Sequence, residues 1–389
     1  MKKIIFSVLG LMLISSGYAQ SIHQDSRLEQ TPPGNIPQIF APGIISLDNR
    51  FETYPTFSPD GNELFFSVVN AIWSQGKILH SIKQNGNWSE PDTAIFSNNN
   101  YKNWESFISP DGTRQFFASN RPPSTNMDIW MVERTSDSTW SDPVRLDNPV
   151  NSNAEDGSAC VTNNGTLYFK SRRGGGIGGS WLYRSKQIDS SYSHVESLGN
   201  LINTGPQETE PFVAPDESYL IFTSSTRPGY DGWDLWICFQ NTDSSWTEPI
   251  NMGPSINTAD DEYGPRVSLN GNYLFFTREN TGITMDIYWV SSGIIDSLKS
   301  TVFSSIHPSV KQNIQLYPNP ANNTIKILFG TLSYKIAFIK LMDIDGKLIL
   351  SDTCHNLPAV TIDLSGKPKG IYFLRIDVDG EVFIKKIVH

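Results

Sequence analysis

Six acidic residues recur at one place in a pattern that repeats along this 389-residue chain. Aligned on the turns that follow them, they form two columns: Glu52, Asp156, Glu208 and Glu262 in the first, and Glu105 and Glu210 two residues further on. Side chains two residues apart in a strand lie on one face, so we expect these carboxylates to converge. Together they could bind a cation or sugar hydroxyls, or act as the acid and base of a glycoside hydrolase.

A structural role is the competing interpretation of these acids. Each could accept hydrogen bonds from backbone donors or pair with an arginine of its own unit. Four arginines lie just past the following strand, where hairpin pairing would bring them close: Arg121, Arg173, Arg227 and Arg278. Because a catalytic pair should differ from its counterparts, whereas these acids recur, the pattern favours structure or ligand binding over catalysis.

The elements that position the acids form a repeat of 51 to 54 residues. Five similar turns define it, at residues 58–61, 109–112, 162–165, 214–217 and 268–271, and the first two read SPDG. Each turn follows a short strand and precedes an aromatic-rich strand such as LFFS, which is a strong hairpin signal. Two further strand-like segments follow in each unit, and the second of them begins at a tryptophan. Each unit is therefore predicted to have four antiparallel strands. Repeats of this length are typical of blades or solenoid turns, so residues 35–298 are predicted to be all-β.

The last unit lacks its fourth strand, and the N-terminus supplies a candidate. Residues 37–42 (PQIFAP) are similar to residues 249–254 (PINMGP), which begin a fourth strand elsewhere. With this strand the five units close into a ring that leaves no exposed sheet edge. We therefore expect a five-bladed rather than a six-bladed β-propeller. The repeat also resembles the WD-like repeats of TolB-type β-propellers, a resemblance that implies the architecture and no particular activity.

The N-terminus and the charge balance restrict the location and the partners. Lys2 and Lys3, an apolar run at 4–13 and small residues before Gln20 predict a signal peptide over residues 1–19. The apolar run is too short to span a bilayer, and Gln20 stands where a lipoprotein needs cysteine. Residues 20–300 contain 18 basic and 33 acidic residues, and the net charge is −10. Nucleic acid and anionic membrane surfaces are therefore unfavourable partners.

The C-terminal 75 or so residues form a separate segment. Residues 299–313 are predicted to be a Ser-rich linker, and residues 314–389 alternate as the strands of a small β-sandwich. This segment resembles the type A C-terminal sorting domain of the bacterial type IX secretion system. The matching motifs are YPNPA at 317–321, DGK at 345–347, LSGK at 364–367, GIYF at 370–373 and KKIV at 385–388. The resemblance implies export through the periplasm, contact with the type IX machinery, and release or attachment at the cell surface.

Other motifs do not predict a cofactor or a metal. Residues 174–179 (GGGIGG) match a nucleotide-binding fingerprint, but a strand follows where a helix is needed. Asp260 to Glu262 and Asp231 with Asp234 could hold a hard cation, but neither has a calcium-loop pattern. Cys160, Cys238 and Cys354 show no disulfide framework and are expected to be buried thiols. No metal site, catalytic residue or cofactor is predicted.

The function that these features favour is binding. We expect a secreted or surface-displayed propeller that recognises a protein or glycan with the acids at its channel mouth. The alternative is a secreted glycan-active hydrolase that uses two of the same carboxylates. The ligand itself is not predicted by the sequence.

Overall fold

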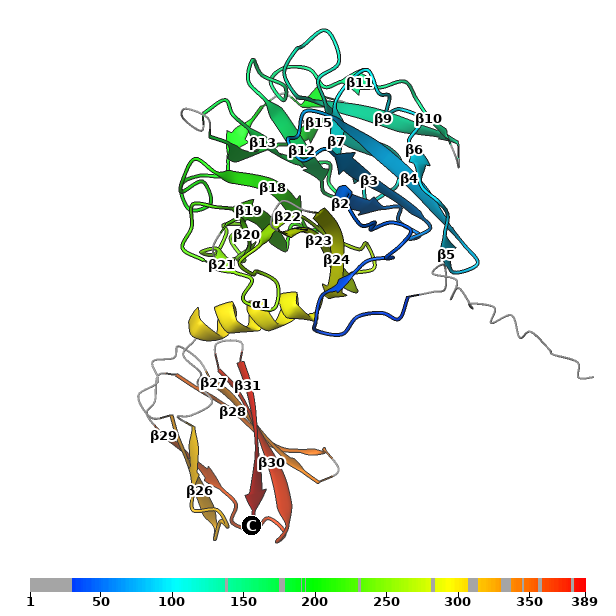
Figure 1. The fold of residues 1–389 in the computed structure, drawn as a ribbon. Helices are drawn as coiled ribbons and strands as arrows, with labels where there is room; N and C mark the ends of the chain where they lie inside the picture. The colour runs from blue at the N-terminus through cyan, green and yellow to red at the C-terminus, as the bar shows by residue number, and fades with distance from the viewer. Residues whose placement is uncertain are drawn as a thin grey trace, which may run out of the picture. The chain divides into compact units, whose positions relative to one another are not determined.

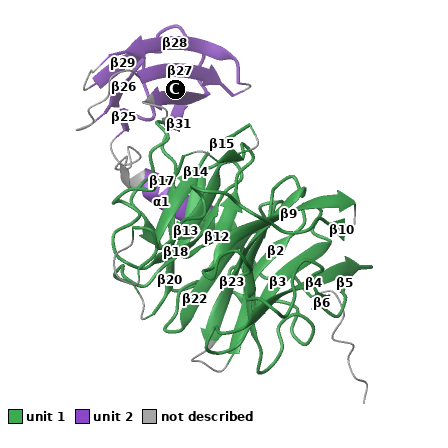
Figure 2. Cartoon of the chain, turned by 90° about the horizontal axis from the view of Figure 1, so that it is seen from above, with its two compact units in different colours: residues 1–295 green, residues 296–389 purple. Residues whose placement is uncertain are grey.

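The computed structural model describes residues 30–136, 139–174, 179–189, 191–192, 194–229, 232–280, 284–306, 314–329, 337–344, 346–355, 359–378 and 381–389. The chain forms two compact units, residues 1–295 and residues 296–389 (Figure 2). Strands dominate both units, as an all-β prediction requires. The signal-peptide prediction lies outside the described residues.

Unit 1 consists of strands that recur in groups along the chain and pair antiparallel within each group (Figure 1). The first and last groups also meet through a parallel pairing of Phe51 in β2 with Met285 in β24. The first group is β2 (Phe51–Phe57), β3 (Glu63–Val69), β4 (Gly76–Gln84), β5 (Asn87–Trp88) and β6 (Asp92–Thr93). The second is β7 (Asn103–Ile108), β8 (Arg114–Ser119), β9 (Asp128–Ser136), β10 (Thr139–Trp140) and β11 (Val144–Arg145). The third is β12 (Asp156–Val161), β13 (Leu167–Ser171), β14 (Trp181–Ser185), β15 (Gln187–Ile188), β16 (Ser191–Tyr192) and β17 (Glu196–Ser197).

The fourth and fifth groups have the same order of strands. The fourth is β18 (Glu208–Val213), β19 (Tyr219–Ser224), β20 (Asp234–Phe239) and β21 (Ile250–Asn251), and the fifth is β22 (Asp261–Val267), β23 (Tyr273–Asn280) and β24 (Thr284–Ser291). The first strands of the groups make a closed cycle of contacts: β2 with β7, β7 with β12, β12 with β18, β18 with β22, and β22 with β2. Side chains on these innermost strands can therefore meet although they are far apart in sequence.

The predicted hairpin turns are confirmed, and their side chains explain them. Ser58 Oγ donates to Asp60 Oδ1 at 2.5 Å, and Asp60 Oδ1 accepts the Asn62 N–H at 3.1 Å. Gly61 has φ of 71°, a conformation that glycine adopts without strain. Ser109 and Asp111 make the same contact in the next turn. Local turn chemistry therefore fixes where β2 and β3, and β7 and β8, pair.

Each innermost strand also contains a bulge that the repeat pattern did not reveal. The register against the next strand shifts after Thr53, Trp104, Gly157, Thr209 and Tyr263. The residue that follows each shift has positive φ, between 46° and 58°: Tyr54, Glu105, Ser158, Glu210 and Gly264. Only one of these is glycine, so the composition gave no signal of a left-handed backbone. The bulges redirect one side chain per strand.

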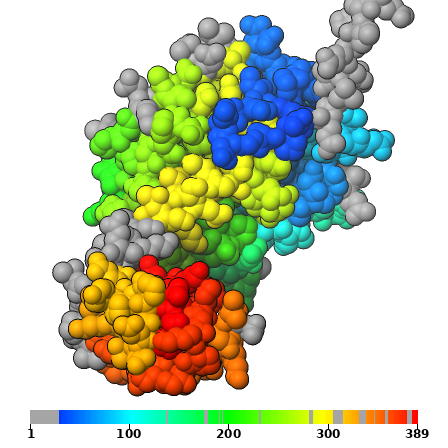
Figure 3. All heavy atoms as spheres, turned by 90° about the horizontal axis from the view of Figure 1, so that it is seen from below, coloured from blue at the N-terminus to red at the C-terminus, as the bar shows by residue number. Residues whose placement is uncertain are grey.

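The N-terminal strand completes the last group, as predicted. β1 (Gln38–Ile39) pairs antiparallel with β24, with Ile39 opposite Tyr288. β21 pairs with β20 in the same register, with Asn251 opposite Trp236. Phe40, Ile44 and Ile45 behind β1 are buried. In Figure 3 this N-terminal arm, coloured blue, lies against the last group of strands, coloured yellow and yellow-green.

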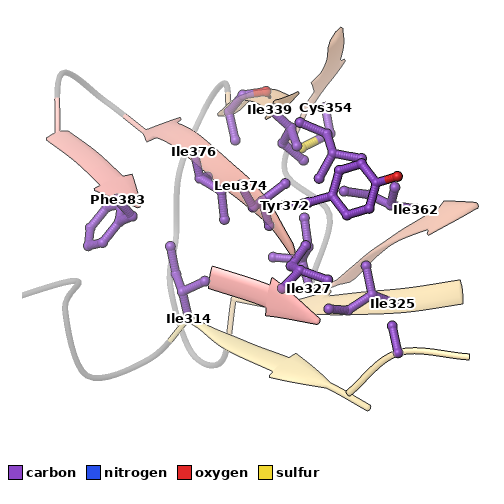
Figure 4. Close-up of a cluster of buried hydrophobic side chains, with 14 of the residues drawn as sticks. Ile314, Ile325, Ile327, Ile339, Cys354, Ile362, Tyr372, Leu374, Ile376 and Phe383 are labelled. Atoms are coloured by element: carbon purple, nitrogen blue, oxygen red, sulfur yellow. Dashed lines mark hydrogen bonds between the residues drawn. The ribbon is translucent and has the colours of Figure 1, made fainter. Parts of the chain in front are cut away.

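Unit 2 is a two-layer β structure with its own core. One sheet has the order β25 (Gln315–Tyr317), β26 (Thr324–Leu328), β29 (Ala359–Asp363), and the other β28 (Leu348–Cys354), β27 (Ala337–Asp343), β30 (Ile371–Val378), β31 (Glu381–Val388). Alternate residues of both sheets fill the space between them, among them Ile325, Ile339, Leu374 and Ile376 (Figure 4). This core is independent of unit 1.

The segment predicted as a linker begins within a helix. α1 (Gly293–Ile306) extends into residues 299–313, and residues 307–313 lie outside the described part of the chain. A sequence signal was present and was missed, because Ile295, Leu298, Val302 and Ile306 are spaced by three, four and four residues.

Candidate functional site

The first-column acids make contacts within their own repeat units. Glu262 Oε1 accepts from Arg278 Nε and from Thr258 Oγ1, each at 2.7 Å. Asp156 pairs with Arg173 Nη2 at 2.9 Å and accepts the Ser152 N–H at 2.7 Å. Both carboxylates are fully buried. These contacts match the structural interpretation of the two acids.

Glu208 and Glu52 have other partners than an arginine from the following strand pair. Glu208 accepts from the hydroxyls of Thr204 and Thr226 at 3.0 and 3.1 Å, whereas Arg227 donates to the carbonyls of residues 201 and 202. Glu52 pairs with Arg50, two residues before it. In the second unit Asn103 replaces the acid and accepts from Arg121 at 2.7 Å. The first-column residues therefore bind different partners in the different units.

The second-column acids meet in one buried cluster, which we call the channel cluster: Tyr54, Glu105, Lys170 and Glu210. Lys170 Nζ lies 2.5 Å from Glu105 Oε1, and the Ser158 N–H donates to Glu105 Oε2 at 2.6 Å. Tyr54 Oη donates to Glu210 Oε1 at 2.5 Å, and the Gly264 N–H donates to Glu210 Oε2 at 2.7 Å. These groups come from all five innermost strands and from β13.

Burial and neighbouring charges shift the pKa values of Glu210, Lys170 and Arg266. Burial raises the pKa of Glu210, and the negative charge of Glu105 raises it further. The positive charge of Lys170 and the hydrogen bond from Tyr54 act in the opposite direction. Burial lowers the pKa of Lys170, but the charges of Glu105 and Glu210 more than offset it, so this pKa lies above its ordinary value. Arg266 is a buried cation whose guanidinium lies 5.4 Å from the Phe107 ring centroid, whereas Lys170 is half-buried. Burial lowers the pKa of Arg266, and the charges of Glu210 and Glu105 oppose this shift.

Aromatic side chains continue from the channel cluster towards solvent. The ring centroid of Trp73 lies 6.3 Å from that of Tyr54 and 5.9 Å from that of Trp104. Lys102 Nζ lies 5.7 Å from the Trp104 ring centroid. Trp73 and Tyr263 are half-buried and pack with Trp104 and Met285. Flat apolar surfaces next to buried carboxylates are suited to a ligand with both ring faces and hydroxyl groups.

Sequence reasoning therefore found Glu105 and Glu210 but missed Tyr54, Lys170 and Arg266. Tyr54 stands in the same column as Glu105 and Glu210, so the column itself was a usable signal. Lys170 is the last residue of the aromatic motif LYFK, where a lysine normally reaches solvent. Arg266 occupies a position with no charged counterpart in the other units: Thr56, Phe107, Cys160 and Phe212.

Gly157 makes room for the channel cluster, and substituting it tests the packing. A Cβ there would overlap Glu105 Oε2 and approach Ala118 Cβ and Lys170 Cε at 3.4 Å. Because Glu105 is held by Lys170 and by Ser158, we expect Gly157→Ala to lower the free energy of unfolding by about 1–3 kcal/mol. Gly34→Ala is the control, since a Cβ there meets nothing within 4 Å. Equal melting temperatures for the two variants would contradict this packing.

Glu52 predicts a pH dependence of stability. Burial raises its pKa from 4.5 to about 7, although Arg50 opposes the shift. A carboxyl whose pKa is higher in the folded than in the unfolded chain stabilises the fold below the unfolded pKa and loses that contribution as pH rises through the folded pKa. We expect the free energy of unfolding to fall by on the order of 2–3 kcal/mol between pH 4.5 and 7 because of this group.

Thermal melts at pH 5 and pH 8 check this expectation. Glu52→Gln should have a smaller difference between the two melting temperatures than the parent chain, because the amide does not titrate. Glu90→Gln, at an exposed position, should keep the full difference. If Glu52→Gln and the parent respond equally to pH, Glu52 does not titrate in this range.

The structure also bears on the other motifs: the acidic clusters, the glycine-rich loop and the cysteines. No group of three or more His, Cys, Asp or Glu that could hold a metal occurs among the residues that the structure describes. Residues 175–178 of the glycine-rich loop and Asp231 lie outside the described residues. Cys160 and Cys238 are buried thiols, and burial raises the pKa of Cys160 to about 11. Among described helices none is long and apolar enough to cross a membrane.

Comparisons with known proteins identify the C-terminal segment. Residues 315–389 match the secretion system C-terminal sorting domain, which is the type IX assignment expected from the motifs. No curated protein matched the sequence. This sorting domain indicates export to the cell surface or secretion.

Solved structures of low similarity include TolB-type and glycan-active proteins. A TolB protein from Agrobacterium tumefaciens is 15% identical with a TM-score of 0.38, over 87% of this chain and 91% of that chain. A GH43 endo-arabinanase from Bacillus licheniformis is 12% identical with a TM-score of 0.42, over 63% and 95%. An endo-arabinase from Bacteroides thetaiotaomicron is 13% identical with a TM-score of 0.42, over 66% and 95%. Likenesses at this level transfer no activity to this chain.

Proposed function

We propose that this chain is an exported five-bladed β-propeller that binds an extracellular glycan or protein at the mouth of its central channel. The channel cluster is the observation that carries the proposal. Its two carboxylates, lysine and tyrosine come from strands that no local interaction brings together. Next to it, Trp73 and Tyr263 offer half-buried ring surface to a ligand. Rigid scaffolds commonly present binding groups in this way.

The number of blades is supported by strand pairing and by contacts. Five hairpin turns define five groups of strands, and their innermost strands contact one another in a closed cycle. β1 supplies the outer strand of the last group. A sixth blade would have to interrupt the contact between β22 and β2, which are neighbours. Export would begin with the signal peptide at residues 1–19 and end with the type IX machinery acting on the tail.

The binding mouth that we propose has Glu105 and Glu210 at its floor. Glu52, Asp156, Glu208 and Glu262 then act by holding the surrounding loops rather than by touching the ligand. Their buried contacts with threonine, serine, arginine and backbone groups support this division. Loss of a first-column acid should therefore weaken binding through a loss of stability.

Glycan hydrolysis is the second candidate, and one asymmetry favours it. The second column holds acids in only two of the five units, with tyrosine, serine and glycine in the others. Glu210, whose pKa is raised by burial, suits a general acid, and Glu105, which pairs with Lys170, is the second carboxyl group. Two carboxyl groups in unlike environments are what a glycosidase requires.

The test combines binding and hydrolysis on the full exported chain. Trp73→Ala should abolish retention on immobilised polysaccharides or on cell-surface protein fractions while the melting temperature changes little. Glu210→Gln and Glu105→Gln should also reduce retention, measured well below their melting temperatures. Release of reducing ends from the same polysaccharides, lost in both Gln variants, would favour the hydrolase. Retention that is unchanged in all three variants would contradict a binding site at this mouth.

A further inference from the structure

A cavity of about 720 Å³ lies elsewhere in unit 1, between the first and last groups of strands. It is at the turn end of the innermost strands, whereas Tyr54 and Glu105 are near their beginnings. We call it the seam pocket and define it by its ring-bearing lining: Phe40, Phe57, Trp88, Tyr273, Phe275 and Trp289. Its size is within the range of small-molecule sites. The channel mouth does not use these residues.

The repeat shows what fills the equivalent place between the first and second groups. There the Arg134 guanidinium lies 4.3 Å from the ring centroid of Trp140. Arg134 also donates to Glu63 Oε2 at 2.5 Å and to the Gly112 carbonyl at 3.0 Å. Trp140 is consequently buried. An ion pair stacked on a tryptophan closes that junction.

At the seam the same positions hold different residues. The Lys83 N–H donates to the Asn62 carbonyl as the Arg134 N–H donates to the Thr113 carbonyl, so Lys83 corresponds to Arg134. Trp88 corresponds to Trp140, and Tyr273, five residues after Ser268, corresponds to Glu63, five residues after Ser58. Because Tyr273 replaces the carboxylate, no equivalent of the Glu63 ion pair can form at that position. Trp88 is only half-buried and borders the cavity.

The walls of the seam pocket are held in place by the protein itself. Gln30 Nε2 donates to the Ile39 carbonyl at 2.7 Å, and Gln30 Oε1 accepts the Ala41 N–H at 2.8 Å. Asp60 is fixed by Ser58 and by Asn62, whose Nδ2 donates to it at 2.9 Å. The ring centroids of Phe57 and Phe275 are 4.5 Å apart. When the side chains of a site are already ordered, ligand binding costs little free energy for ordering them.

The lining determines the class of ligand. One acid and one base, Asp60 and Lys83, are the charged residues among those that line the pocket, so it has no net charge to select an ion. The lining combines aromatic rings with turn residues that have hydroxyl, amide and carboxylate groups, including Asn62, Ser268 and Asn270. A neutral molecule with an apolar face and several hydroxyl groups suits both kinds of lining residue.

From this geometry we propose that the seam pocket is a binding site for a neutral saccharide of one or two rings. The sugar ring lies against Trp88 and Tyr273, and its hydroxyl groups meet the turn residues of the first and last groups. The site is separate from the proposed channel mouth and does not depend on it.

Saturation-transfer NMR on the full exported chain tests the proposal. The probes are glucose, mannose, galactose, arabinose, cellobiose and maltose, with glucuronate and a deca-proline peptide as competing classes. We expect at least one neutral sugar to bind, and Trp88→Ala to weaken its Kd by about tenfold or more, as truncation of a central ring does. Trp73→Ala, at the channel mouth, should leave that Kd unchanged.

Tyr273→Glu is the second variant, because it introduces the carboxylate of the neighbouring junction and should close the pocket without unfolding the chain. It should abolish sugar binding with a melting temperature close to that of the parent. The proposal is wrong if no neutral sugar binds, if glucuronate or the peptide binds there instead, or if neither Trp88→Ala nor Tyr273→Glu affects binding. A failure of the channel mouth would appear separately, as retention on polysaccharides that Trp73→Ala leaves intact.

Discussion

A chain that begins at Leu47 is expected to lose most of its folding stability and to aggregate. It lacks β1, whose pairing with β24 supplies the outer strand of the last group. It also lacks Phe40, Ile44 and Ile45, which are buried. Burial of such side chains is worth about 1.5–3 kcal/mol each, so the loss is on the order of 5 kcal/mol or more. This approaches the whole stability of many domains.

The matched control for this truncation is a chain that begins at Gln30. It keeps β1 and the Gln30 contacts to residues 39 and 41. We expect it to melt like the parent chain and to remain monodisperse in light scattering, whereas the shorter chain exposes the edge of β24 and associates. Similar melting temperatures for the two truncations would show that β1 is not what closes unit 1.

Deletion of residues 314–389 is expected to abolish export beyond the periplasm while unit 1 remains folded. Unit 1 has its own core and closes without unit 2, so the shortened chain should keep a cooperative melting transition. The deleted residues include the sorting domain at 315–389, which indicates export. Fractionation of a host with type IX machinery, with immunoblots of periplasm, cell surface and medium, measures the outcome.

A point substitution separates loss of the tail from loss of its fold. Leu374 is fully buried in the core of unit 2, so Leu374→Asp should unfold the sandwich by placing an unpaired charge there. We expect it to be retained like the deletion. Lys340→Ala, at an exposed position, should be exported normally. Truncated protein at the cell surface in amounts like the full-length chain would contradict the sorting role.

Short-range patterns account for what could be predicted about the fold. The Ser58 and Asp60 turn, the aromatic strand after it and the 51- to 54-residue period are local properties, and the structure confirms the hairpins they predict. The proline-framed match between residues 37–42 and 249–254 predicted β1, because both segments meet the same kind of partner strand. The sorting motifs are also local. The helix at 293–306 was missed although its apolar spacing was visible.

The candidate site was only partly predictable, because its contacts are long-range. Tyr54 and Glu210 are 156 residues apart and come together because β2 and β18 both line the centre of the cycle. The positive φ of Glu105 and Glu210 results from a bulge that no glycine marks. Lys170 turns inward because two buried carboxylates attract it. The shared column could indicate that Tyr54 joins Glu105 and Glu210, but no local pattern in the sequence could indicate the bulge or the inward direction of Lys170.

The sequence by itself determined the repeats, the closing strand, the two-unit organisation and the export signal, since each depends on residues that are close together or on periodic spacing. The tertiary structure alone decided which acids contact groups of their own repeat unit and which contact groups from other innermost strands. It also decided that Trp88 borders a cavity while Trp140 is covered by Arg134. The physical reason is that burial, pairing and pKa depend on neighbours that ring closure brings together from strands more than 200 residues apart, such as β2 and β22.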